Sequence, residues 1–147
     1  MPVVTITPSR RVAWLPLAGN ICLWMIQLYA VYVFVPAGYA KVTGAAWAVQ
    51  FFGNLGLGQW FRYFTGLTEL TGAALLLTPW LSAFGALLLS CTMVGAIITH
   101  VFALHNSPLY PLALLVLLLV VAAGRRGQLL AAAEKAGLAR LVNKWRP

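Results

Sequence analysis

A single carboxylate inside an apolar stretch is the side chain of this sequence with the clearest potential for chemistry. Glu69 is one of only two acidic residues, and it stands about nine residues, or roughly 13 Å, inside a hydrophobic run if that run is helical. An isolated carboxylate in hydrocarbon is costly, so it must face other helices, be protonated or be paired. Two interpretations stay open: Glu69 carries protons or binds a ligand, or it anchors the fold through an ion pair or hydrogen bond.

Three residues are candidate partners of this acid. Thr65 and Arg62 precede Glu69 by four and seven residues, which places them on the same face of a helix. Lys41 ends the preceding apolar run, and a lysine in that position can reach inward by roughly 6 Å. Consecutive helices joined by a short connection are usually neighbours. The sequence therefore predicts a Lys41–Glu69 pair between the first two apolar runs.

A histidine near the outer end of the third apolar run is the second candidate for chemistry. His100 follows Thr99, and the sequence has one other histidine, His105. No further His, Asp or paired Cys completes a metal-ligand set, so we expect no metal site; haem ligation by His100 alone has no supporting motif. A hydrogen-bonded core histidine, a proton relay and a ligand contact all stay open for His100.

These residues predict one polar site in the outer half of the protein. Its candidate catalytic groups are Glu69 and His100. Its candidate ligand-binding residues are Lys41, Arg62, Thr65, Glu69, Thr99 and His100. Serine–histidine–aspartate catalysis is excluded because the sequence contains no aspartate.

Other polar and small residues in the apolar runs are expected to serve packing. Gln27 lies in the inner half of the first run, where an interhelical hydrogen bond is its expected role. Cys22 and Cys91 have no CxxC or zinc spacing and are expected to be small buried hydrophobes. Residues that permit close helix approach are expected at Gly66, Gly72, Ala73, Gly85 and Gly95.

The elements that must position the site are membrane helices. The composition is 62% hydrophobic and 8% charged, whereas soluble domains are about 25% charged. Spans are predicted at about 17–40, 60–78, 80–104 and 109–123, each roughly 20 to 35 Å long. Pro36 predicts a bend in the first span. The aromatic, glycine-rich stretch 42–59 predicts a short interfacial or re-entrant segment.

Basic residues flank this hydrophobic region and predict its orientation. Arg10 and Arg11 precede the region, and the tail 124–147 carries six more Lys and Arg residues. Positive flanks favour the cytoplasm, so we expect one multi-pass domain over 1–147 in a bacterial-type inner (plasma) membrane, with both termini cytoplasmic. Residues 127–145 predict a surface helix on the cytoplasmic side, and a frayed basic tail is the alternative. The lipid bilayer is the expected partner, and nucleic acid is not, because no basic groove-sized face or fold motif is present.

Three sequence segments resemble the DoxX-like family of small four-helix membrane proteins. Pro36–Lys41 ends a run in a small-residue–Gly–x–x–Lys pattern, Gly66–Leu77 reads GxxExxGxxLLL, and Met93–His100 follows in order. The resemblance covers about residues 17–123 and departs at Pro79, where members often have Gly. The resemblance implies that Lys41 and Glu69 occupy positions that are characteristic of the family. Some relatives are the membrane subunit of thiosulfate:quinone oxidoreductase, others belong to membrane redox assemblies, and many have no assigned activity.

The expected architecture is all-α, a polytopic membrane four-helix bundle, and three functions are compatible with it. The first is the membrane subunit of a redox system that holds a quinone or similar apolar ligand and acts with a separate partner subunit. The second is a non-catalytic scaffold or assembly protein, in which Lys41–Glu69 is a packing ion pair. The third is a small transporter, which would need a polar path across the whole membrane. A homo-oligomer is compatible with each of them.

Overall fold

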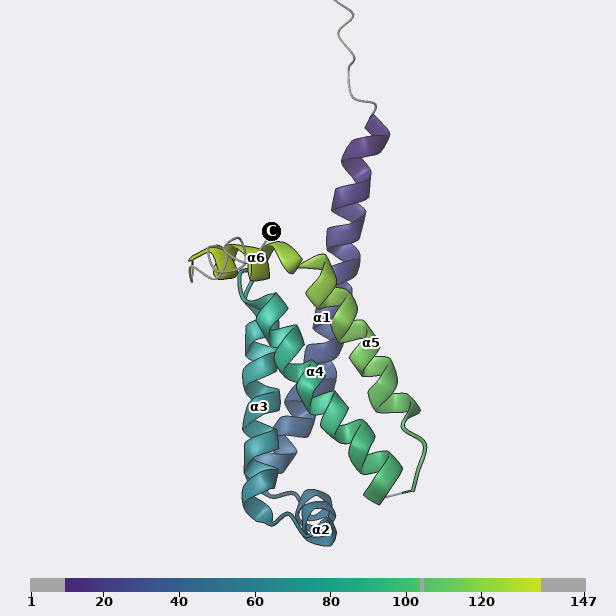
Figure 1. Cartoon of the computed structure of the whole chain (residues 1–147), viewed down its shortest axis with the longest axis vertical. Coiled ribbons are helices and arrows are strands. Elements are labelled where there is room, and N and C mark those ends of the chain that lie inside the picture. Colours follow the sequence, from purple (N-terminus) through teal and green to yellow (C-terminus); the bar gives the residue numbers. More distant parts are fainter. Residues whose placement is uncertain (1–9, 104, 136–147) are drawn as a thin grey trace, which may run out of the picture.

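The computed structural model describes residues 10–103 and 105–135, and every regular element within these ranges is a helix (Figure 1). This confirms the all-α class. The elements are α1 (Arg10–Thr43), α2 (Ala46–Asn54), α3 (Gln59–Leu77), α4 (Ser82–Ile98), the π-helix η1 (Thr99–Ala103), α5 (Leu109–Gly124) and α6 (Arg126–Lys135).

Four of these helices pack side by side. The helix α1 contacts α3 and α5, and α4 contacts α3 and α5. The short helix α2 lies at one end of this group and α6 lies crosswise at the other, while the first turns of α1 extend past α6 (Figure 1). We refer to these as the α2 end and the α6 end. The start of α1 and the whole of α6 therefore lie toward the same end of the molecule (Figure 1).

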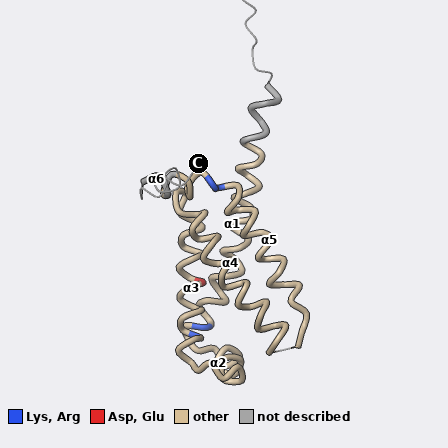
Figure 2. The backbone as a smooth tube through the Cα atoms, viewed as in Figure 1, with Lys and Arg blue, Asp and Glu red and all other residues tan. Residues whose placement is uncertain are grey.

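Two helical segments are long and apolar enough to cross a membrane, namely Leu17–Thr43 and Ser82–Ala103. Only 22% of each hydrophobic window is buried inside the protein, whereas the core helix of a soluble protein would be mostly covered. A third apolar helix, Leu109–Gly124, is shorter. Charged positions are sparse along the packed helices (Figure 2). The uncovered apolar surface indicates a membrane protein, since lipid can cover it and water cannot.

Proline and glycine positions set several helix boundaries. Thr78 takes an extended conformation and ends α3, as expected for a residue that precedes a proline. Gly58 has a positive φ of 78°, which lets the chain turn sharply before α3 begins. The helix α1 continues through Pro36 as one element. The helical boundaries fall within a few residues of the predicted runs, except that α1 begins earlier, at Arg10.

Close contacts at glycines join the helices. A Cβ added to Gly66 of α3 would lie 2.9 Å from Lys41 Cβ and 3.0 Å from the Gly38 carbonyl oxygen of α1. A Cβ added to Gly85 of α4 would lie 2.7 Å from the Gly72 carbonyl oxygen of α3. Such small residues let helix backbones approach directly. The predicted packing roles of these α3 and α4 glycines are thus confirmed.

Three packing expectations were wrong. A Cβ at Gly95 would meet no atom within 4 Å, so this glycine is not needed for helix contact. Cys22 and Cys91 are exposed rather than buried among helices. The apolar character of a membrane helix does not reveal which side faces its neighbours, because the lipid-facing side is apolar as well.

At the α6 end, Gln128 ties α6 to the turn between α3 and α4. Its Oε1 accepts a hydrogen bond from the Ala83 backbone N–H at 3.0 Å, and its Nε2 donates to the Pro79 carbonyl. The amide thus pairs a backbone donor that the first turn of α4 leaves free. The predicted surface helix at 127–145 is described as α6 up to Lys135, and the remainder of that prediction lies outside the described residues.

The close packing at Gly85 can be tested by comparing two glycine substitutions in α4. Gly85→Ala forces a methyl group against the Gly72 carbonyl and the Leu76 backbone nitrogen, both at 2.7 Å, so we expect a loss of about 1–3 kcal/mol in unfolding free energy. Gly95→Ala is the matched control in α4 and should be within about 0.5 kcal/mol of the parent protein. Unfolding in detergent micelles measures both, and equal effects would contradict this packing.

Candidate ligand-binding cavity

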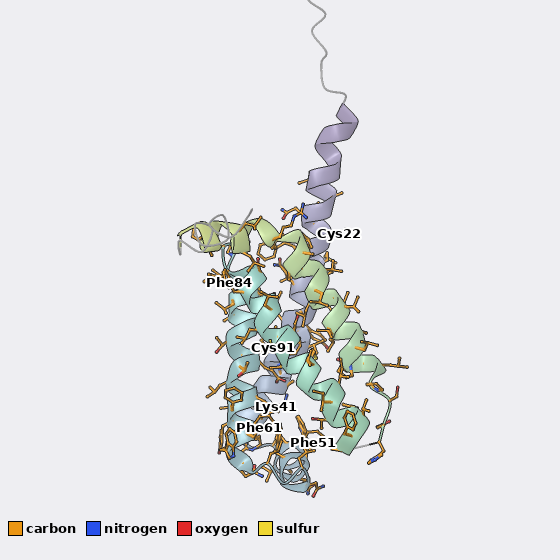
Figure 3. The ribbon with its side chains drawn as sticks, viewed as in Figure 1. Cys22, Lys41, Phe51, Phe61, Phe84 and Cys91 are labelled. Atoms are coloured by element: carbon orange, nitrogen blue, oxygen red, sulfur yellow. The ribbon has the colours of Figure 1, made fainter. Side chains whose placement is uncertain are left out.

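A partly enclosed cavity of about 730 Å³ lies at the α2 end. Its wall is formed by residues of α1, α2, α3, α4, η1 and the first turns of α5, and most of them are aromatic or aliphatic. Figure 3 shows Lys41, Phe51 and Phe61 together in this region. Polar and thiol side chains in the wall are Lys41, Thr65, Thr68, Glu69, Cys91, Thr92, Thr99, His100 and Tyr110. This volume is within the range of small-molecule sites, about 300–1,000 Å³.

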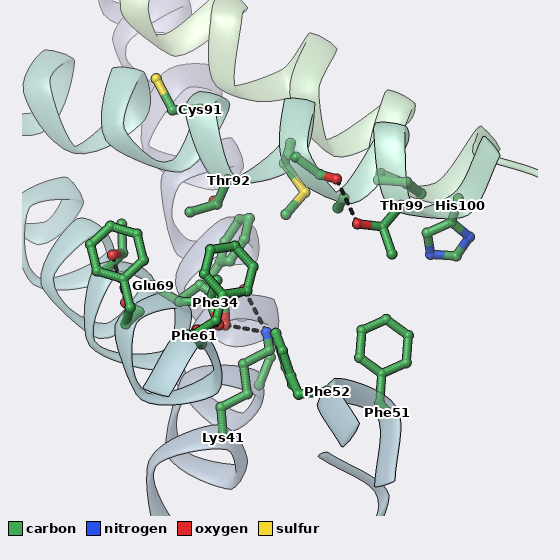
Figure 4. Close-up of a pocket in the computed structure, with 18 of the residues that line it drawn as sticks. Phe34, Lys41, Phe51, Phe52, Phe61, Glu69, Cys91, Thr92, Thr99 and His100 are labelled. Atoms are coloured by element: carbon green, nitrogen blue, oxygen red, sulfur yellow. Dashed lines mark hydrogen bonds and ion pairs between the residues drawn. The ribbon is translucent and has the colours of Figure 1, made fainter. Parts of the chain in front are cut away.

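The central polar feature of the wall is an ion pair between α1 and α3. Lys41 Nζ lies 2.6 Å from both carboxylate oxygens of Glu69, and the two side chains are only 14% and 6% exposed. The predicted Lys41–Glu69 pair is therefore confirmed. The close approach of Gly66 to Lys41 Cβ and to the Gly38 carbonyl places the lysine side chain alongside α3, where it reaches the acid (Figure 4).

Arg62 forms a hydrogen bond with the backbone of Lys41 and does not line the cavity. Its guanidinium Nη1 donates to the Lys41 carbonyl, one of the last carbonyls of α1, which have no partner within the helix. Its Nε donates to Gln59 Oε1 at 2.7 Å, and Gln59 Nε2 donates to the Val49 carbonyl of α2 at 3.0 Å. Arg62 was predicted to contact a ligand; it lies outside the cavity wall, and its guanidinium contacts the Lys41 backbone instead.

The two predicted threonines do line the cavity, and both hydroxyl groups donate within their own helices. Thr65 Oγ1 donates to the Phe61 carbonyl at 2.9 Å, and Thr99 Oγ1 donates to the Gly95 carbonyl at 2.9 Å. These bonds use the hydroxyl hydrogen, but the oxygen lone pairs can still accept. Each threonine therefore offers an acceptor to a ligand, and neither offers a free donor.

His100 faces the cavity from η1, across from the ion pair (Figure 4). Its Nδ1 is buried and has no hydrogen-bond partner. A buried polar atom without a partner costs about 1–3 kcal/mol, so a ligand atom or water that pairs with it would be stabilising. The π-helical turn at Thr99–Ala103 is a feature often found at functional sites. Among the described residues, no group of His, Cys, Asp or Glu could hold a metal ion.

The aromatic wall was missed by the sequence analysis. Phe51 and Phe52 of α2 have ring centroids 5.3 Å apart, and Phe52 meets Phe61 of α3 edge-on at 6.0 Å. Phe61 in turn stacks with Phe64 at 6.1 Å. The stretch 42–59 was predicted to be a short interfacial or re-entrant segment, with no part in the site. The available signal was the spacing of Trp47 and Phe51, four residues apart and hence on one helical face.

The arrangement can bind a ring-shaped apolar molecule and hydrogen-bond its polar edges. Aromatic rings supply flat contact area, while Lys41, Glu69 and His100 supply charge, proton donors and acceptors. The polar groups project from α1, α3 and η1 into the same cavity.

The comparison with known proteins identifies one family. A family model described as the DoxX-like family matches residues 8–123 of the chain, a segment that includes Lys41, Glu69 and His100. No curated protein and no solved structure matches the chain.

The ion pair generates a double-mutant test. Glu69→Gln leaves the lysine ammonium without its anion, and Lys41→Met leaves the carboxylate without its cation; breaking a largely buried pair costs roughly 3–5 kcal/mol. The double variant removes both charges, so its destabilisation should be smaller than the sum by about 1–3 kcal/mol. Equilibrium unfolding in mixed micelles measures the coupling, and strictly additive losses would show that the two groups do not interact.

Proposed function

The chain belongs to the DoxX-like family, and we propose that it binds a quinone or a similar small apolar ligand as the membrane subunit of a redox system. The observation that carries this proposal is the unpaired, buried Nδ1 of His100 in the same apolar cavity as the Lys41–Glu69 pair. The proposed catalytic groups are Glu69 and His100. The proposed ligand contacts are these two residues with Lys41, Thr65 and Thr99.

A quinone fits the chemistry of this wall. Its flat ring matches the phenylalanine surfaces, and its two carbonyl oxygens accept hydrogen bonds. An ammonium group has three N–H donors, and the two Glu69 oxygens leave Lys41 at least one for a ligand. His100 donates from Nδ1 in the tautomer that carries the proton there and accepts in the other. Two-electron reduction of a quinone consumes two protons, and Glu69 and His100 can hold protons for it; the electrons come from a separate partner subunit.

The proposal includes a membrane orientation. We place α1, α3, α4 and α5 across the membrane as a four-helix bundle, since α3 and α5, at about 28 and 24 Å, approach the roughly 30 Å hydrocarbon thickness. The α6 end faces the cytoplasm of a bacterial-type inner membrane, because Arg10 and Arg11 at the start of α1 and Arg125 and Arg126 where α6 begins lie toward that end. The cavity then opens in the outer half of the membrane. The whole chain forms a single membrane domain.

A scaffold function is the second candidate, favoured by one observation. The Lys41–Glu69 pair sits beside the Gly38–Gly66 crossing of α1 and α3, where an ion pair would fix helix register without any ligand. A transporter is less compatible with the packing. Within the described part of the chain, the core between the two ends includes the fully buried Ala73, Leu76 and Leu89, and the hydroxyl of the buried Ser90 donates to the Ala86 carbonyl of its own helix.

Ligand binding is tested most cleanly at His100, because its Nδ1 has no partner in the protein to lose. His100→Leu should lower the quinone retained per mole of purified protein by about fivefold to tenfold, the effect of one hydrogen bond. The control is His105→Asn, which changes a histidine outside the cavity wall at a positive φ of 49° that Asn tolerates.

Retained quinone is extracted and measured by chromatography. No bound quinone in the parent protein, or equal retention in both histidine variants, would favour the scaffold function.

Orientation is tested by cysteine labelling in a Cys22→Ser/Cys91→Ser background. Asn106→Cys lies in the exposed connection before α5, and Gly127→Cys lies on exposed α6, where an added Cβ meets no atom within 4 Å. A membrane-impermeant maleimide should label position 106 in intact spheroplasts and position 127 only after permeabilisation. The reverse pattern would overturn the proposed orientation.

A further inference from the structure

A second polar cluster lies at the α6 end, away from the cavity. It consists of Gln27 and Trp24 of α1 and Arg125, which follows the last turn of α5. Arg125 Nη2 donates to Gln27 Oε1 at 3.5 Å, and the guanidinium carbon lies 5.6 Å from the Trp24 ring centroid. Gln27 is wholly buried, so the expected interhelical hydrogen bond exists, and its partner is a charged side chain.

The backbone holds this arginine firmly in place. A Cβ on Gly124 would lie 2.7 Å from Leu23 Cδ1, so the end of α5 packs directly on α1. The Arg125 backbone N–H donates to the Val121 carbonyl at 2.9 Å and closes the last turn of the helix. The backbone from which the guanidinium extends is therefore fixed against α1.

The cluster has more donors than acceptors. Gln27 Nε2 and Arg125 Nε are both buried and without hydrogen-bond partners. Among the side chains that the structure describes, Glu69 is the only carboxylate, and Lys41 binds it at the opposite end. A partly buried guanidinium without an anion is unfavourable, so an external anion that pairs with the exposed part of Arg125 would be stabilising.

We propose that Arg125, oriented by Gln27 and Trp24, binds an anionic phosphate group at the α6 end. Part of the arginine is exposed, and a planar guanidinium presents paired N–H donors to phosphate oxygens. Tryptophan beside the cation suits the membrane–water interface. Either a phospholipid headgroup or dissolved phosphate supplies this chemistry. The site is independent of the cavity and of its proposed ligand.

The test compares lipid retention by the full chain. Purified protein is equilibrated with mixed micelles that contain dioleoyl phosphatidylglycerol or dioleoyl phosphatidylcholine, and bound lipid is counted by native mass spectrometry. We expect a preference for phosphatidylglycerol that Arg125→Gln reduces by about fivefold or more. Arg126→Gln, at the exposed neighbouring arginine, should reduce it less than twofold.

Gln27→Glu separates anion binding from folding. This variant places a carboxylate beside Arg125, so it should abolish the phosphatidylglycerol preference and leave the melting temperature in phosphatidylcholine unchanged or higher. Competition with inorganic phosphate distinguishes the sources: displacement of the lipid at millimolar phosphate identifies a soluble-anion site, and no displacement identifies a headgroup site. Equal losses in Arg125→Gln and Arg126→Gln, or no preference for the anionic lipid in the parent protein, would overturn the proposal.

Discussion

The structure depends on accommodating one carboxylate among apolar helices. Glu69 is acceptable there because Lys41 lies 2.6 Å away, and Lys41 reaches it because α1 and α3 approach closely at Gly38 and Gly66. Arg62 adds a hydrogen bond to the Lys41 carbonyl and fixes the backbone from which the lysine extends. The pattern GxxExxG in α3 thus has a physical meaning: Gly66 admits the helix that carries the cation, and Gly72 admits α4 on the other side.

The Lys41–Glu69 pair could serve helix packing alone or also bind a ligand, and the residues around the pair distinguish between these roles. A purely structural ion pair needs no cavity beside it. Lys41 and Glu69 instead line a cavity of about 730 Å³, and phenylalanine rings of α2 line the same cavity. An unpaired histidine nitrogen in that cavity leaves hydrogen-bonding capacity that the protein itself does not use. These features favour ligand binding over a scaffold role.

Sequence patterns predicted those features of the fold and the site that depend on the spacing of residues along the chain. Hydropathy located the helical runs, proline and glycine located several of their ends, and residue spacing with the reach of a lysine predicted the Lys41–Glu69 contact. Rotation of each helix about its axis was not accessible, because apolar side chains face both lipid and protein. For that reason Gly95, Cys22 and Cys91 were misplaced. The Gln27–Arg125 pair joins segments far apart in sequence, and the α2 wall arises from the packing of α2 on α3, which hydropathy does not reveal.

The most direct measurement is an experimental density map of the full chain, purified with its native lipids, at a resolution that shows side chains around Lys41 and Glu69. We expect a flat, ring-shaped density between the phenylalanines of α2 and His100, within hydrogen-bonding distance of Lys41 Nζ. An empty or collapsed cavity, with α2 packed directly against α4 and the Lys41–Glu69 pair sealed from any ligand, would contradict it.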